Sequence, residues 1–155
     1  MITMRVFLLG LVVLPLAGCA QGPQATDAPP FKPVASNLDL MESLIGHMAT
    51  DVFASVGTII DETGTHEIAP QDDEAWEEVQ FAAMGLAETG NLLMFPTRAM
   101  DQEDWLTLSQ QLVDRSVEAA KAAEAKDAAA LLDAGGRIYE VCTACHMKYI
   151  PADPQ

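Results

Sequence analysis

The segment that decides the fold lies near the C-terminus and reads IYEVCTACHMKY, residues 138–149. Within it, Cys142, Cys145 and His146 stand at positions i, i+3 and i+4. On a helix, residues at these spacings project from the same face. Asp127 precedes the apolar pattern that leads into this segment, and aspartate is a favoured N-terminal cap. We therefore predict a C-terminal helix that begins near Asp127 and presents two thiols and one imidazole together.

Three further amphipathic patterns precede this helix. They cover about residues 37–61, 72–94 and 101–125, each with apolar residues at three-and-four spacing. Serine or aspartate residues at the start of each pattern can cap a helix. The stretch 63–70 breaks the spacing and is expected to be a loop.

The composition fits an all-α domain. The 155 residues suffice for one domain, and only 6% are aromatic, which favours helices over a β-sandwich or barrel. No stretch alternates with the period of a strand over a useful length. Four helices joined by short links are typical of an up-down-up-down bundle. We expect an antiparallel four-helix bundle over residues 37–150, followed by a tail at 151–155.

The charge limits the classes of partner. The chain has 23 Asp and Glu against eight Lys and Arg, a formal net charge of −15. Binding to nucleic acid depends on basic surfaces that attract phosphates. We therefore expect no nucleic-acid partner.

The N-terminus has the features of an export signal. A single positive charge precedes the apolar run 6–16, which is followed by small residues up to Cys19. The ending LAGC resembles the lipobox of bacterial lipoproteins, in which cleavage precedes the cysteine and its thiol is acylated. We expect a signal peptide over 1–18, a lipidated Cys19 and a Pro-rich tether over 19–36, on the periplasmic side of a bacterial membrane. An ordinary signal peptide, and hence a soluble periplasmic protein, is the alternative.

The remaining two cysteines indicate a cofactor. Cys-x-x-Cys-His is the attachment sequence of c-type haem, because two thiols one turn apart add to the vinyl groups and the adjacent imidazole reaches the iron. We expect one covalent haem c at Cys142 and Cys145, with His146 as an iron ligand. A dithiol redox pair would need a strand before it in a βαβ setting. A zinc site would need further ligands, for which His47 and His66 are the candidates.

With one such motif at the end of four predicted helices, the chain resembles the class II cytochromes c, the cytochrome c-prime family and its low-spin relatives. The resemblance covers about residues 37–150. It includes Tyr149, three residues after His146, and the pair Leu40 and Met41 early in the first helix. It implies a four-helix fold with haem c on the last helix, and it places Met41 opposite the haem as the distal iron ligand.

Two positions depart from the family pattern. Many members carry an arginine four residues before that methionine, where it meets a haem propionate, and here the residue is Asn37. A basic residue commonly follows the aromatic, and here it is Ile150. The candidates for propionate contacts are then Arg98, Arg137 and Lys148.

The function depends on the group opposite His146. A methionine gives six-coordinate iron suited to electron transfer, whereas an empty apolar site leaves iron open to small ligands. Met41 is the expected ligand, and an open site, Met48 or His47 are the alternatives. We expect a mono-haem cytochrome without an independent catalytic site that exchanges single electrons with a redox partner protein.

Two other functions fit the same motif. The first is a five-coordinate protein that binds nitric oxide or other small gases. The second is a haem accessory subunit or sensor that docks on a larger enzyme. The resemblance also implies a homodimer through the first two helices, because class II relatives often pair in this way.

Overall fold

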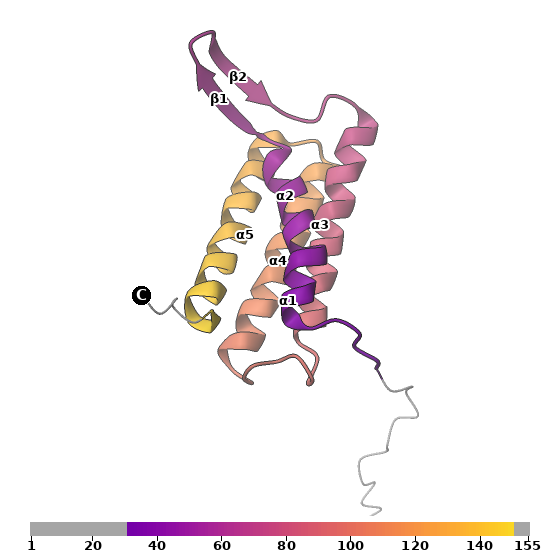
Figure 1. Cartoon of the computed structure of the whole chain (residues 1–155). Helices are drawn as coiled ribbons and strands as arrows, with labels where there is room; N and C mark the ends of the chain where they lie inside the picture. The colour runs from indigo at the N-terminus through magenta and orange to yellow at the C-terminus, as the bar shows by residue number, and fades with distance from the viewer. Residues whose placement is uncertain (1–30, 151–155) are drawn as a thin grey trace, which may run out of the picture. The chain divides into compact units, whose positions relative to one another are not determined.

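The computed structural model describes residues 31–150 (Figure 1). The expected signal peptide, the lipidation of Cys19, most of the expected tether and the C-terminal tail lie outside these residues. The described helices and strands belong to one unit of the chain, which begins at Pro33. None of the helices over residues 31–150 is long and apolar enough to cross a membrane.

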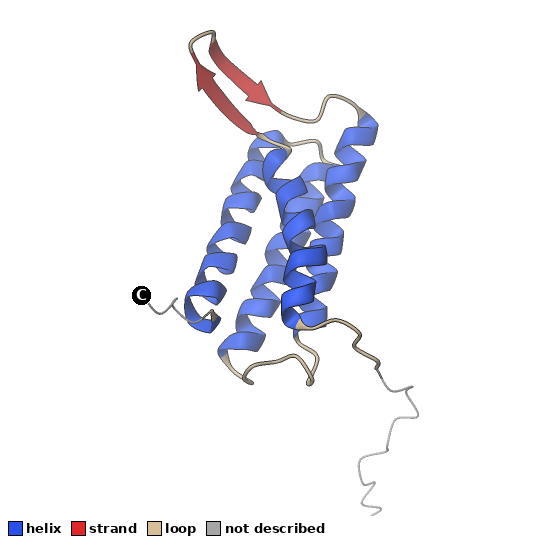
Figure 2. Cartoon of the chain, viewed as in Figure 1, coloured by secondary structure: helices blue, strands red, loops and turns tan. Residues whose placement is uncertain are grey.

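The described part of the chain is mostly helical and carries one small sheet (Figure 2). In chain order the elements are α1 (Asn37–Leu40), the π-helical turn η1 (Met41–Ile45), α2 (Gly46–Ala54), β1 (Gly57–Asp61), β2 (Gly64–Ile68), α3 (Asp73–Leu93), α4 (Asp104–Glu124) and α5 (Ala128–Tyr149). The first three follow one another without a break. The prediction of a helical domain is therefore confirmed in its main part.

Side-chain caps fix where the helices begin. Ser36 and Asp39 form a capping box, in which each side chain accepts a hydrogen bond from the other residue's backbone N–H. Asp72 and Asp127 each accept the backbone N–H three residues further on, at 2.9 and 3.0 Å. These bonds satisfy N–H groups that the first turn of a helix leaves without a partner.

The core lies between the helices, which pack side by side (Figure 1). The contact of α3 with α4 is the most extensive, and α4 also packs against α5. Gly90 allows α3 to approach α4 closely, because a Cβ there would lie 2.7 Å from the Val113 side chain and 3.0 Å from the Ser109 carbonyl oxygen. By contrast, α2 makes few contacts with α5. This difference leaves space between α2 and α5.

The prediction of one helix over 37–61 is wrong beyond Ala54. Residues 57–68 instead form an antiparallel hairpin, in which Thr58 lies opposite Glu67 and Ile60 opposite Thr65. The stretch 63–70, expected to be a loop, contains the whole of β2. The chain therefore contains a short sheet that the periodicity did not indicate.

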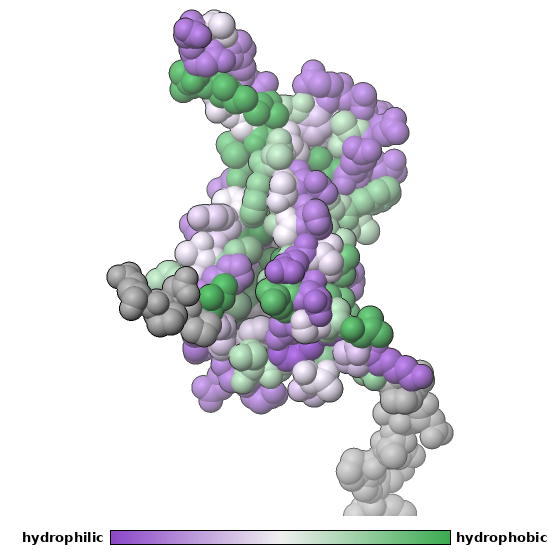
Figure 3. Space-filling model, in the orientation of Figure 1, coloured by the Kyte–Doolittle hydropathy of each residue, from purple (hydrophilic) through white to green (hydrophobic). Residues whose placement is uncertain are grey.

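Local chemistry explains the hairpin. Residues 58–60 are all β-branched, and such side chains favour strands over helices. At the tip, the Asp61 carboxylate accepts the N–H and hydroxyl of Thr63 at 2.8 and 2.6 Å. Gly64 follows with a φ of 134°, which only glycine adopts readily. Figure 3 shows hydrophobic side chains along the hairpin and hydrophilic ones at its tip.

Candidate cofactor site

A cavity of about 250 Å³ lies between α2 and α5 and is open to solvent on one side. It is lined mainly by apolar side chains, and the lining comes from all four long helical segments of the described chain. The structure brings Met41, Cys142, Cys145 and His146 together here. These are the four residues that the sequence predicted to share one site.

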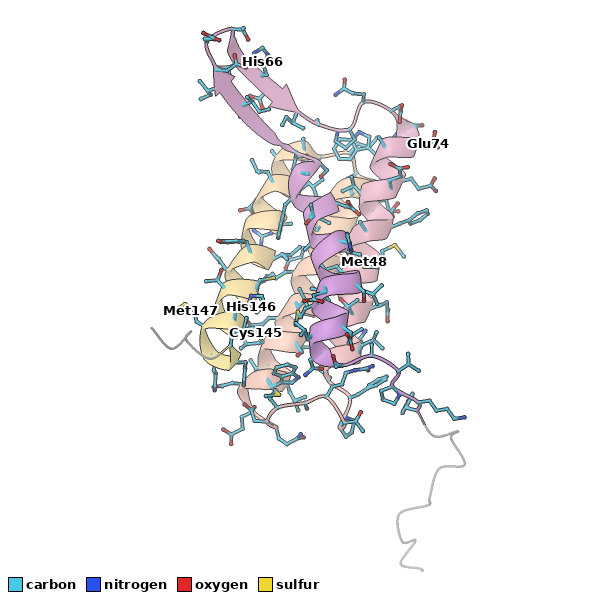
Figure 4. The ribbon with its side chains drawn as sticks, viewed as in Figure 1. Met48, His66, Glu74, Cys145, His146 and Met147 are labelled. Atoms are coloured by element: carbon cyan, nitrogen blue, oxygen red, sulfur yellow. The ribbon has the colours of Figure 1, made fainter. Side chains whose placement is uncertain are left out.

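One wall of the cavity belongs to the last turns of α5. Cys142 and Cys145 are half-buried there, and His146 is exposed at the opening. Figure 4 shows Cys145 and His146 on the side of α5 that faces α1 and α2, with Met147 on the opposite side. Met147 is 82% exposed, and it therefore cannot bind a group in the cavity together with His146.

Burial keeps both thiols protonated. The pKa of Cys142 is raised by burial and, to a smaller extent, by the nearby Cys145, and burial also raises the pKa of Cys145. Both are free thiols in the structure. A dithiol redox pair needs a lowered pKa, which such pairs gain at the N-terminus of a helix. Here the cysteines lie near the C-terminus of α5, where the helix dipole disfavours a thiolate.

The opposite wall belongs to η1 and α2, and Met41 is half-buried there. Of the three candidates for a distal ligand, only Met41 lines the cavity. The Met48 sulfur packs against α3, where a Cβ on Gly85 would lie 2.8 Å from it. His47 is exposed and lies outside the lining.

Arg98, a candidate for propionate contacts, is buried and lies outside the cavity lining. Its guanidinium donates to the carbonyl oxygens of Ala35 at 3.2 Å and Leu92 at 3.4 Å. Asn37 donates from its amide to the Arg98 carbonyl oxygen at 2.9 Å. These bonds tie the approach to α1 to the α3–α4 connection, so Arg98 has a structural role here.

The other two candidates pair with carboxylates outside the cavity. Arg137 contacts Asp133 and Glu118, with 3.1 Å from its Nε to Glu118, and the bond to Asp133 is the first cause of its raised pKa. Lys148 pairs with Asp104, which likewise raises the pKa of the lysine. The structure therefore brings none of the three predicted cations to the site.

A cluster that the sequence did not predict holds the end of α5. The Tyr149 hydroxyl donates to one oxygen of Asp101, and the other oxygen accepts the Trp105 N–H at 3.0 Å. The Trp105 indole donates to the Leu93 carbonyl oxygen at 2.7 Å and meets the Tyr149 ring edge-on at 5.0 Å. This cluster fixes the chain three residues after His146 against the start of α4.

The titration of the cluster reflects these contacts. The Tyr149 hydroxyl, helped by backbone N–H donors, lowers the pKa of Asp101 to about 2. Burial and the bonded carboxylate raise the pKa of Tyr149 to about 12. The hydrogen bond between Asp101 and Tyr149 joins residues 48 positions apart, and such a pairing leaves no local signal in the sequence.

The geometry gives no support to a zinc site. Over residues 31–150, no three His, Cys, Asp or Glu side chains are placed to share a metal ion. His66 lies on β2 beside Asp61 and Thr63, far from His146 (Figure 4). A Cys2His2 site built from His47 and His66 is therefore inconsistent with this fold.

The cavity thus combines sulfur and nitrogen donors on facing walls with an apolar lining. Two thiols and an imidazole come from α5, and one thioether comes from η1. Comparison of the chain with family models, with curated proteins and with solved structures gave no match.

Proposed function

We propose that this protein is a mono-haem c-type cytochrome that carries single electrons, with its haem in the cavity between α2 and α5. The observation that carries this proposal is the convergence of Met41, Cys142, Cys145 and His146 on one apolar cavity. In this proposal the four helical segments form the up-down-up-down bundle of the class II cytochromes c, which the sequence resembles.

The residues present fit haem c. Thiols and imidazole stand at i, i+3 and i+4 on α5, the arrangement that attaches the vinyl groups and ligates the iron from one side. The volume of about 250 Å³ is slightly below the roughly 300–1,000 Å³ of small-molecule pockets, but the open side leaves room for a larger flat group. Bound haem supplies a one-electron iron couple.

The protein's own residues would set the properties of that couple. Cys142 and Cys145 would hold the haem covalently, and His146 and Met41 would supply the ligands of its iron. Leu108 and Leu112 help to line the cavity and keep water from the buried side. A methionine ligand and an apolar setting both affect the reduction potential.

Electron transfer is favoured over gas binding by the placement of Met41. Because its thioether lies on the wall that faces α5, a small ligand would have to displace it. The proposal includes lipid attachment at Cys19 on the periplasmic side of a bacterial membrane and a redox partner protein. A homodimer through the first two helical segments, implied by the resemblance, belongs to the same proposal.

The first test is covalent attachment. The full chain, exported in a bacterium with the haem-attachment machinery, should gain the mass of one haem and keep its colour after denaturation. Cys142→Ser with Cys145→Ser should abolish both. A double variant that still gains the mass of haem and keeps its colour after denaturation would exclude c-type attachment at this motif.

The second test separates an electron carrier from a gas-binding protein. The oxidised wild type should be low-spin with the far-red sulfur–iron band, and it should resist carbon monoxide when reduced. Met41→Ala should remove the band, turn the iron high-spin and allow carbon monoxide to bind. A high-spin wild type whose spectrum does not change in Met41→Ala would instead support the five-coordinate protein.

A further inference from the structure

A π-helical turn occupies the helix at the position of the candidate distal ligand. The backbone N–H of Gly46 donates to the carbonyl oxygen of Met41, five residues before it. A regular α-helix makes this bond to the fourth residue before. Single π turns inside α-helices are rare and often occur at functional sites. Here the turn begins at Met41 itself.

The burial pattern shows what the extra residue does. Leu40 and Ile45 are 3% and 5% exposed although they stand five residues apart, whereas Leu44 is 36% exposed. In an unbroken α-helix Leu44 would share the buried face of Leu40, because it stands four residues further on. Compared with an unbroken α-helix, the turn therefore rotates residues 37–41 relative to α2 by about 100°, the angle that one helical residue covers.

This rotation determines which residues face the cavity. Met41 and Gly46 both line it, together with Ile45 and Ala49. Residues five apart stack on one another in a π turn, because its hydrogen bond joins them. Because residue 46 is glycine, it places no side chain against the turn that begins at Met41.

Gly46 is the residue that permits the turn. A Cβ at this position would lie 2.8 Å from the Met41 carbonyl oxygen, a backbone atom that cannot move aside as a flexible side chain could. Glycine is a poor helix former, so its presence within a helical segment needs a reason. Two hydroxyls bond to the backbone in and after the turn: Ser43, within the turn, donates to the Asp39 carbonyl oxygen, and Thr50, on α2, donates to that of Gly46.

We propose that Gly46 and the π turn position Met41 as the distal ligand. Gly46 lets the helix take up one extra residue, and this directs the Met41 thioether into the cavity opposite His146. Gly46 is thus a positioning residue that acts through Met41. This inference rests on the proposed function, because it assumes an iron that Met41 binds.

The test is Gly46→Ala in the haem-loaded full chain, with Gly136→Ala as the matched control. Gly136 lies within α5, outside the cavity lining, and a Cβ there meets nothing within 4 Å. The added methyl at position 46 should displace the Met41 backbone. We expect the far-red sulfur–iron band to be largely lost and the apparent affinity for carbon monoxide to rise at least about tenfold, in proportion to the fraction of open iron. Gly136→Ala should keep the wild-type spectrum and affinity.

A second variant guards against a simple folding defect. Deletion of Ser43, an exposed residue of the turn, removes the extra residue and restores α-helical spacing. Leu40 and Met41 then stand four residues before Ile45 and Gly46 and keep the helix face that they share with them, so the sulfur–iron band should persist. Gly46→Ala added to the Ser43 deletion should therefore also keep the band, and the helix content measured by circular dichroism, because no π turn remains for the added methyl to disrupt.

The outcomes separate this inference from the proposed function. A wild type with the band, together with a Gly46→Ala protein that keeps both the band and the resistance to carbon monoxide, or whose band does not return when Ser43 is also deleted, would overturn the positioning role alone. A wild type that lacks the band would overturn Met41 ligation and this inference with it. Loss of the band in Gly46→Ala, its return when Ser43 is also deleted, and its retention in Gly136→Ala support the inference.

Discussion

Asp101 and Tyr149 form the hydrogen bond that ties the end of α5 to the start of α4, and it predicts two pH windows of instability. The pKa of Asp101 falls from 3.8 to about 2 on folding, so its contribution is complete above pH 3.8 and is lost as the pH falls towards 2. The pKa of Tyr149 rises from 10.0 to about 12, so its contribution is complete below pH 10 and is lost as the pH rises towards 12. The urea midpoint of the wild type should fall in both windows.

Variants test this assignment. Tyr149→Phe should lower the midpoint at neutral pH and remove the dependence between pH 10 and 12 that the tyrosine causes. Asp101→Asn should remove the carboxylate's part of the fall between pH 4 and 2. Tyr139→Phe is the control, because within the described chain the Tyr139 hydroxyl has no hydrogen-bond partner and the residue is 63% exposed. Equal pH profiles for Tyr149→Phe and Tyr139→Phe would contradict the role of the cluster.

Residues whose roles depend on near neighbours could be predicted from the sequence. Cys142, Cys145 and His146 lie within five positions, so helical geometry alone places them together, and the structure agrees. Met41 came from the resemblance to a family, and the structure places it on the facing wall. The contacts of Arg98 could not be predicted, since its partners Ala35 and Asn37 are more than 60 positions away.

At the scale of elements, the hairpin over 57–68 should contribute little to stability. Residues 58–68 are all exposed, and isolated two-stranded hairpins are marginally stable in water. Replacing residues 58–67 with a Gly-Gly link should therefore change the free energy of unfolding by less than about 1 kcal/mol. Urea denaturation measures this change. Gly57 and Ile68 pair across the strands, so the short link can join them.

A core substitution supplies the comparison for the hairpin. Ile138 on α5 is fully buried, and truncation to alanine should cost about 2–5 kcal/mol. A loss of similar size on removing the hairpin would show that it packs more strongly than its exposure indicates.

The elements also show where sequence patterns fail. Helix starts were predictable because caps such as Asp72 and Asp127 act over three residues. The end of the first helix was not, because Val56 and Ile60 continue the three-and-four spacing although residues 57–61 form a strand. The π turn was equally hidden, since Leu44 and Ile45 both fit an amphipathic helix and only packing decides which is buried.

For the whole molecule, the charge of −15 predicts how the proposed electron exchange depends on the charge of the reaction partner. Long-range attraction speeds the encounter of opposite charges and weakens with salt, because the Debye length falls from about 30 Å at 0.01 M to about 8 Å at 0.15 M ionic strength. Oxidation of the reduced, haem-loaded protein by the cationic hexaammineruthenium complex should therefore slow as ionic strength rises. Oxidation by anionic ferricyanide should become faster, and stopped-flow absorbance measures both rates.

Charge reversal near the cavity tests whether electrons leave the proposed haem on that side of the molecule. Glu42 lies in the π turn next to Met41, whereas Glu67 lies on the hairpin, and both are exposed. The two reversals change the net charge equally, so any difference between them reports distance from the reacting group. Glu42→Lys should slow the cationic oxidant at low salt more than Glu67→Lys does, because Coulomb interactions weaken with distance. Equal effects of the two variants would mean that only the net charge affects the rate. Rates that do not change with salt would mean that charge does not control the electron exchange.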